Sequence, residues 1–113
     1  MGQSSPRSGQ LGSNVGTDVS ERIITFLRRR YPTKTAECVA AELNVSEATA
    51  KKWLSRMSVP SGLVIIRMVA HYGPEFLAAT MSSPPKWLDA AARAEEQARI
   101  RASIAALQLK LEG

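Results

Sequence analysis

Cysteine and histidine are almost absent from this chain of 113 residues, which holds one of each, Cys38 and His71. A lone cysteine cannot form an internal disulfide. One cysteine and one histidine also cannot supply a catalytic triad or the usual ligand set of a zinc site. The sequence contains no glycine-rich phosphate loop and no evident pair of catalytic carboxylates. We therefore expect no enzymatic activity, no metal, no cofactor and no small-molecule substrate.

Long apolar runs are missing as well. No stretch approaches the roughly 20 apolar residues that a membrane span needs, and the opening MGQSSPRSGQ lacks the apolar stretch of a secretory signal. These two absences predict a cytoplasmic protein with no membrane partner. Hydrophobic residues make up 44% of the chain, which is ordinary for one soluble domain with a short appendage.

Positive charge is present in excess and is unevenly distributed. The formal net charge is +5, and the isoelectric point of about 9.9 fits a nucleic-acid binder. Residues 22–34 contain five basic side chains and no acidic one, and residues 51–67 contain four basic side chains and no acidic one. The acids between these bands are Glu37, Glu42 and Glu47. This banding favours a docking face for a polyanion.

Residues 36–54, AECVAAELNVSEATAKKWL, have the pattern of two short helices joined by a tight turn. A helix-turn-helix uses this arrangement to place its second helix in a DNA major groove. Ala40 is small enough to lie where the helices cross, and Asn44 tolerates the left-handed backbone that the turn requires. Val45 is expected to enter the core, and Ser46 to cap the second helix through its side-chain oxygen.

The second helix of this motif has two faces. Its buried side is predicted to consist of Ala50, Trp53 and Leu54. The opposite face carries groups that suit phosphates and base edges. In helix-turn-helix domains of the kind this segment resembles, the start of the preceding helix usually faces a DNA phosphate, so free amides there and Lys34 are expected to form an anion site. The predicted DNA-binding residues are Lys34, Thr35, Ser46, Glu47, Ala48, Lys51, Lys52, Ser55 and Arg56. A surface helix also turns lysine and arginine toward water without binding anything, so composition alone leaves that interpretation open.

The following segment, RMSVPSGLVIIRMVAHYG at residues 56–73, resembles the fourth helix of the lambda-repressor-like (Xre-type) DNA-binding domain. In that family the recognition helix is likewise followed by a loop, a Pro-Ser start and an apolar helix. The resemblance covers residues 19–81 and implies an all-α, five-helix helix-turn-helix domain. Asn44 stands where the family usually has Gly. Glu47 places an acid near the start of the recognition helix, where it could accept from a cytosine amino group or weaken non-specific binding.

Other patterns set the expected limits of this domain. Residues 1–17 are rich in Gly, Ser and Gln and are expected to form a flexible arm, leaving residues 18–81 for the DNA-binding domain. Further helices are predicted at about 18–30, 61–72 and 74–80, with Thr33 or Thr35 capping the second helix and Gly73 ending the fourth. The remaining predicted core residues are Ile23, Ile24, Phe26, Leu27, Leu63, Ile66, Met68, Val69, Tyr72, Phe76 and Leu77.

Two prolines in residues 82–85 predict a stiff linker before a C-terminal helical segment, residues 86–113. We expect i,i+4 ion pairs there between Asp89 and Arg93 and between Glu95 and Arg99. The apolar residues fall into two seams of alternating four- and three-residue spacing: Trp87, Ala91, Ala94 and Ala98, then Ile100, Ile104, Leu107 and Leu111. An apolar face outside a complete domain must be buried on that domain or on a second subunit. We favour the second subunit, with Trp87, Ala91, Ile100, Ile104, Leu107 and Leu111 as the oligomerisation residues.

The sequence therefore predicts a sequence-specific, double-stranded DNA-binding transcriptional regulator. It is expected to act as a homodimer, and as a repressor more than as an activator, on a roughly palindromic operator. Two alternatives remain open. One is a DNA-packaging oligomer of the phage small-terminase type, and the other is an antitoxin that regulates its own gene and binds a toxin through its last helix.

Overall fold

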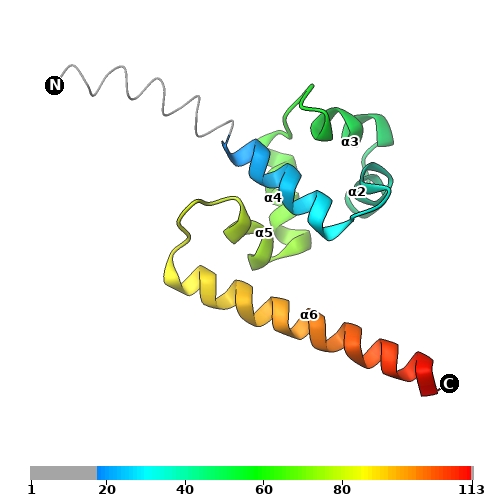
Figure 1. The fold of residues 1–113 in the computed structure, drawn as a ribbon. Helices are drawn as coiled ribbons and strands as arrows, with labels where there is room; N and C mark the ends of the chain where they lie inside the picture. The colour runs from blue at the N-terminus through cyan, green and yellow to red at the C-terminus, as the bar shows by residue number, and fades with distance from the viewer. Residues whose placement is uncertain (1–17, 113) are drawn as a thin grey trace.

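The structure, a computed structural model, describes residues 18–112. Within this range every regular element is a helix, six in all, with no strand, which confirms the all-α prediction. The arm predicted at residues 1–17 lies outside the described residues, as does Gly113. Figure 1 shows the first five helices grouped together and the sixth extending away from them.

The first helix occupies residues 18–30, as its sequence pattern predicts. Ile23, Ile24 and Leu27 recur at helical spacing and are buried, with exposed fractions of 1%, 6% and 0%. Phe26 packs against the same core from a half-buried position. The helix ends before Tyr31, because the residue preceding a proline disfavours helical backbone angles.

Helices α2 (Thr35–Leu43) and α3 (Glu47–Leu54) pack against each other across a short turn. Asn44 adopts the predicted left-handed conformation at φ 57° and ψ 49°, and Ser46 Oγ accepts the Thr49 amide at 3.0 Å, so both predictions are confirmed. The predicted cap of α2 is wrong. The N-cap is Lys34, which makes no side-chain capping bond. Thr35 is buried, and its hydroxyl donates to the Tyr31 carbonyl.

Helices α4 (Gly62–Tyr72) and α5 (Pro74–Ala79) complete the core. Gly73 separates them at φ 79°, a conformation that favours glycine. Met68, Tyr72 and Phe76 are buried as predicted, and the rings of Phe26, Tyr72 and Phe76 lie 5.2 to 5.9 Å apart.

Two core predictions in α4 are wrong. Leu63 is 71% exposed and Ile66 is 65% exposed, whereas Val64 and Ile65 pack against the core in their place. The segment GLVIIRMVAHY is apolar on nearly all sides, so its periodicity does not determine which side is buried. Met57 and Val59, in the preceding loop, are exposed as well.

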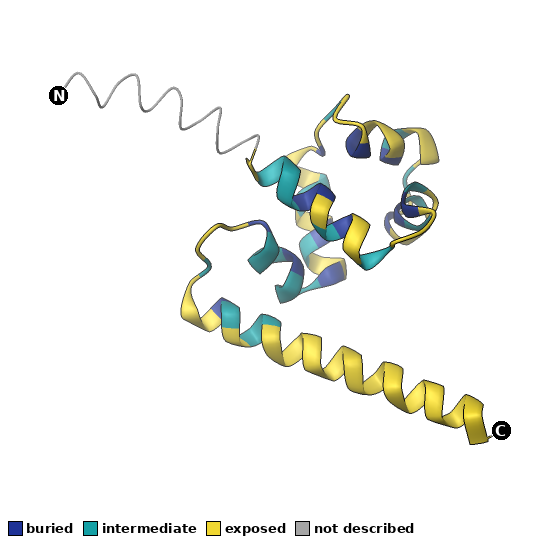
Figure 2. Ribbon diagram, in the orientation of Figure 1, coloured by how far each residue is buried: buried dark blue, intermediate teal, exposed yellow. Residues whose placement is uncertain are grey.

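Helix α6 (Lys86–Glu112) has 27 residues, a length of about 40 Å. Its beginning packs on α5 and buries Leu88, so the C-terminal segment is joined to the domain rather than separate from it. From Arg93 to Glu112 every residue is exposed (Figure 2). Trp87 is 69% exposed and Ala91 is half-buried. None of the helices in residues 18–112 combines the length and the apolarity needed to cross a bilayer.

The two ion pairs predicted along α6 differ in outcome. Asp89 and Arg93 are paired at 3.1 Å, as expected. Arg99 instead bonds to Glu75 of α5, so the predicted pairing with Glu95 is replaced by a tertiary one.

Candidate nucleic-acid interface

Helix α3 presents two different faces, as predicted. Ala50, Trp53 and Leu54 are buried against the core. The predicted contact residues on the other side are all exposed: Ser46, Glu47, Ala48, Lys51, Lys52, Ser55 and Arg56. The small Ala48 and the longer lysines therefore share a surface that a flat or grooved partner can approach.

Two of the positive charges on this surface are paired. Lys51 Nζ lies 3.0 Å from Glu47 Oε2, with both side chains substantially exposed, so this pair exchanges readily with solvent or with another anion. Arg56, at φ 67° just beyond α3, donates from Nε and Nη2 to the Glu21 carboxylate at 2.5 and 2.7 Å. This bidentate contact lowers the pKa of Glu21 and raises the pKa of Arg56. Arg56 is thus held by the first helix.

The start of α2 lies beside α3 and shares a surface hollow of about 540 Å³ with it. Residues 34–37 line this hollow together with Glu47, Lys51 and Ser55. Because no side chain caps α2, the amides of its first turn remain available to an anion. The hollow brings together five predicted residues: Lys34, Thr35, Glu47, Lys51 and Ser55. It does not include Ser46, Ala48, Lys52 or Arg56.

Arg28 also lines the hollow, from the first helix, although it is not among the predicted contact residues. Its place in the acid-free run of residues 22–34 marks it as basic but does not indicate which way it points. Arg30, two residues later, turns toward Glu75 instead.

Thr35 and Ser46 carry structural roles in their side chains. Thr35 is 7% exposed and its hydroxyl is bonded within the protein, so only its backbone amide is a candidate contact. Ser46 Oγ accepts from the Thr49 amide and donates to Thr49 Oγ1 at 2.9 Å. Both residues shape the site more than they supply free donors to it.

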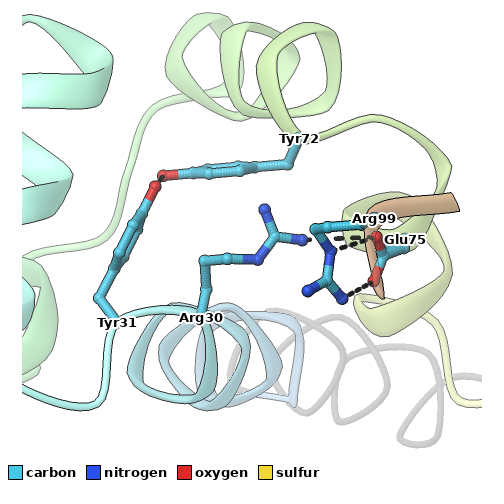
Figure 3. A network of polar contacts seen from close by, with 5 residues as sticks. All are labelled: Arg30, Tyr31, Tyr72, Glu75 and Arg99. Carbon is cyan, nitrogen blue, oxygen red and sulfur yellow. Dashed lines mark hydrogen bonds and ion pairs between the residues drawn. The ribbon is translucent and has the colours of Figure 1, made fainter. Parts of the chain in front are cut away.

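A second polar cluster lies at the junction with α6 (Figure 3). Glu75, whose side chain is only 13% exposed, receives Arg99 Nε and Nη2 at 3.1 and 2.9 Å and lies 3.6 Å from Arg30. Tyr31 donates to the Tyr72 hydroxyl at 3.2 Å, and burial raises the pKa of both phenols. We interpret this cluster as the attachment of α6, because each charge has a partner.

Among the described residues no group of three His, Cys, Asp or Glu side chains is placed to hold a metal ion. His71 Nε2 lies 2.8 Å from Glu42 Oε1 on the surface. Comparison with known proteins gives no match to a family model, to a curated protein or to a solved structure.

Proposed function

We propose that this chain is a lambda-repressor-like helix-turn-helix protein that binds double-stranded DNA through α3 and regulates transcription from a roughly palindromic operator. One observation carries the proposal. The exposed face of α3 and the uncapped start of α2 meet at one hollow, which also receives Arg28, Lys34 and Lys51. This surface combines groups for base edges with groups for phosphates.

The roles divide by geometry. The exposed side of α3 and its C-cap carries Ala48, Lys51 and Ser55. The major groove of DNA is wide enough to admit an α-helix, and side chains on such a face can then reach base edges. The free amides of α2, with Lys34 and Arg28 beside them, suit a backbone phosphate, because helix N-termini attract anions. Phosphate contacts fix the register of the protein, and the α3 side chains then read bases.

Glu47 can give this surface a preference for particular base pairs, and it also weakens binding to DNA that lacks them. In the free protein it pairs with Lys51 at 3.0 Å. On DNA, Lys51 can move to a guanine edge while Glu47 accepts from a cytosine amino group, and sites without such a partner are penalised by the carboxylate. A switch of partners of this kind favours sequence-specific binding over uniform attraction to phosphate.

The test is selection of bound sequences from a random duplex pool with the full chain, followed by affinity measurements on the selected site. Lys51→Ala should weaken binding by about 1–3 kcal/mol and relax the preference at one position of each half-site. Lys110→Ala, a change of the same charge at the far end of α6, is the matched control and should leave affinity nearly unchanged.

Salt dependence provides a second readout. If several cations neutralise phosphates, affinity should fall by roughly a factor of ten or more between low and physiological ionic strength. Selection that enriches no motif, or affinity that ignores salt, would contradict the proposal. Uniform weakening on all sequences by Lys51→Ala would make Lys51 a phosphate contact.

A further inference from the structure

The end of α6 is an exposed apolar feature outside the candidate DNA interface. We call residues 100–112 the outer segment. Its apolar side chains are substantially exposed: Ile100 46%, Ile104 50%, Leu107 59%, Leu109 70% and Leu111 87%. Ile100 borders a surface hollow lined by the first helix and α5, whereas from Arg101 to Glu112 every residue is exposed (Figure 2). A helix with this composition gains stability from a partner surface.

Four of these residues repeat at the spacing of a two-helix seam. Ile100, Ile104, Leu107 and Leu111 follow the alternating four- and three-residue steps of d and a positions, and Gln97 extends the same seam by one position. Trp87 is 13 positions before Ile100, so at 100° per residue it lies about 140° away around the helix. Trp87 and the half-buried Ala91 therefore lie outside this seam, in the separate first seam that the sequence pattern assigns to them.

The charges beside the seam indicate how a second copy would lie. In this heptad frame Glu96 is a g residue and Arg101 is the following e residue, two positions that lie beside one another across a parallel interface. Neither makes an ion pair within the described residues. Two parallel copies in register would form the Glu96–Arg101 pair twice.

An antiparallel pair would gain nothing from these charges. There e residues face e residues and g residues face g residues, which sets Arg101 against Gln108 and Ser103 against Lys110. The parallel arrangement also stacks Gln97 on Gln97 of the second copy at an a position, where a polar pair fixes register. At the preceding d position, Arg93 would face Arg93 of the second copy. These like charges repel each other, so the seam begins at about Gln97.

The structure also supplies the rigid support that so short a seam needs. A seam of about two heptads is marginal between free peptides. Here α6 is already attached to its domain by buried Leu88 and by Arg99, whose bond to Glu75 lies directly before the outer segment. Association therefore does not have to order a whole helix from a disordered chain.

We propose that the outer segment binds a second copy of this chain as a parallel, in-register, two-stranded coiled coil, with Glu96 of each copy paired to Arg101 of the other. The arrangement rests on the proposed function only in supplying two DNA-binding domains to one operator. It requires no DNA to form.

The experiment uses full chains carrying Glu96→Arg or Arg101→Glu, studied without DNA by sedimentation and native mass measurement. Each variant alone sets like charges against each other across the interface and should raise the dimer dissociation constant about tenfold. An equimolar mixture of the two variants restores both attractive pairs and should form mostly heterodimer. Each substitution alters its own helix equally in the homodimer and in the heterodimer. A difference between the single variants and the mixture therefore reports only the contacts between the two chains.

A cross-linking readout tests register directly. In a Cys38→Ala background, Ile104→Cys should form an intermolecular disulfide, because a-position residues of an in-register parallel pair approach within disulfide reach. Ala105→Cys, one position further and off the seam, should not. A monomeric wild-type chain, a mass above the dimer, or a mixture without heterodimer preference would each overturn the proposal. Dimers that select no DNA motif would refute only the proposed function.

Discussion

The body of the protein, residues 18–99, and the outer segment are both helical and both rich in aliphatic residues, yet their side chains have opposite environments. Leu27 is 0% exposed among the first five helices, whereas Leu109 is 70% exposed near the end of α6. The core gathers residues from the first helix and from α2 to α5. The outer segment contributes none. An apolar pattern at helical spacing thus shows that a face needs a partner but does not show where the partner lies.

Within the body, the contact that attaches α6 and so holds the outer segment in place is small and specific. Leu88 is 2% exposed where α6 meets α5. Near the end of that contact, Glu75 binds Arg99 with two hydrogen bonds and lies close to Arg30. Beyond Arg99, no side chain of α6 forms a hydrogen bond or ion pair with the rest of the described chain. The body therefore supplies its own stability, and the outer segment depends on what it meets.

The largest difference in unfolding free energy should appear when the same Leu→Ala substitution is made once in the body and once in the outer segment. Leu27→Ala removes a fully buried side chain and should lower the free energy of unfolding by about 2–5 kcal/mol. Leu109→Ala, off the proposed seam, should change it by less than about 0.5 kcal/mol. Urea unfolding at low protein concentration measures both. Comparable losses would mean that the outer segment is as well covered as the core.

Removal of the Glu75 charge, where α6 is attached, should lower the free energy of unfolding by an intermediate amount. Glu75→Gln removes the anion that Arg30 and the more exposed Arg99 share, from a side chain that is only 13% exposed, and should cost about 1–3 kcal/mol. Hydrogen exchange along residues 86–99 should rise at the same time. Asp89→Asn breaks the exposed pair with Arg93 and serves as the control, with an expected loss below about 1 kcal/mol. Equal losses for both would remove the special role of Glu75.

Deletion of the outer segment should change the stability of the fold less than Leu27→Ala or Glu75→Gln. A chain ending at Arg99 keeps Leu88 and the Arg99–Glu75 contact, so below the dimer dissociation constant its stability should match the full chain within about 0.5 kcal/mol. At higher concentration only the full chain should gain stability with concentration. Loss of folding in the shortened chain would show that the outer segment supports the body.

The smallest effect concerns acid sensitivity. The hydrogen bonds from Arg56 lower the folded-state pKa of Glu21 below the usual value of a glutamate. Glu21 therefore adds stability above the unfolded pKa, and this stability is lost as pH falls through the folded pKa. Glu21→Gln should flatten the dependence of unfolding free energy on pH below about 4.5. Glu112→Gln, in the outer segment, should not change that slope.

Local chemistry in the sequence predicted much of the fold. The first helix, the left-handed Asn44, the Ser46 cap and Gly73 at the end of α4 all follow from backbone preferences that act over a few residues. Leu63 and Ile66 were assigned to the wrong side of α4, because a helix that is apolar all round has no preferred face until its neighbours are placed.

In the candidate site, too, some features follow from the sequence and others only from the tertiary structure. Periodicity alone determined which side of α3 is exposed, because helical spacing puts Ala50, Trp53 and Leu54 on one face. Only the tertiary structure decided that Arg28 joins the hollow, that Glu21 holds Arg56 and that Thr35 is buried. Arg56 and Glu21 are 35 residues apart in the chain. Contacts at such separations depend on how whole helices pack, and no local pattern of residues specifies them.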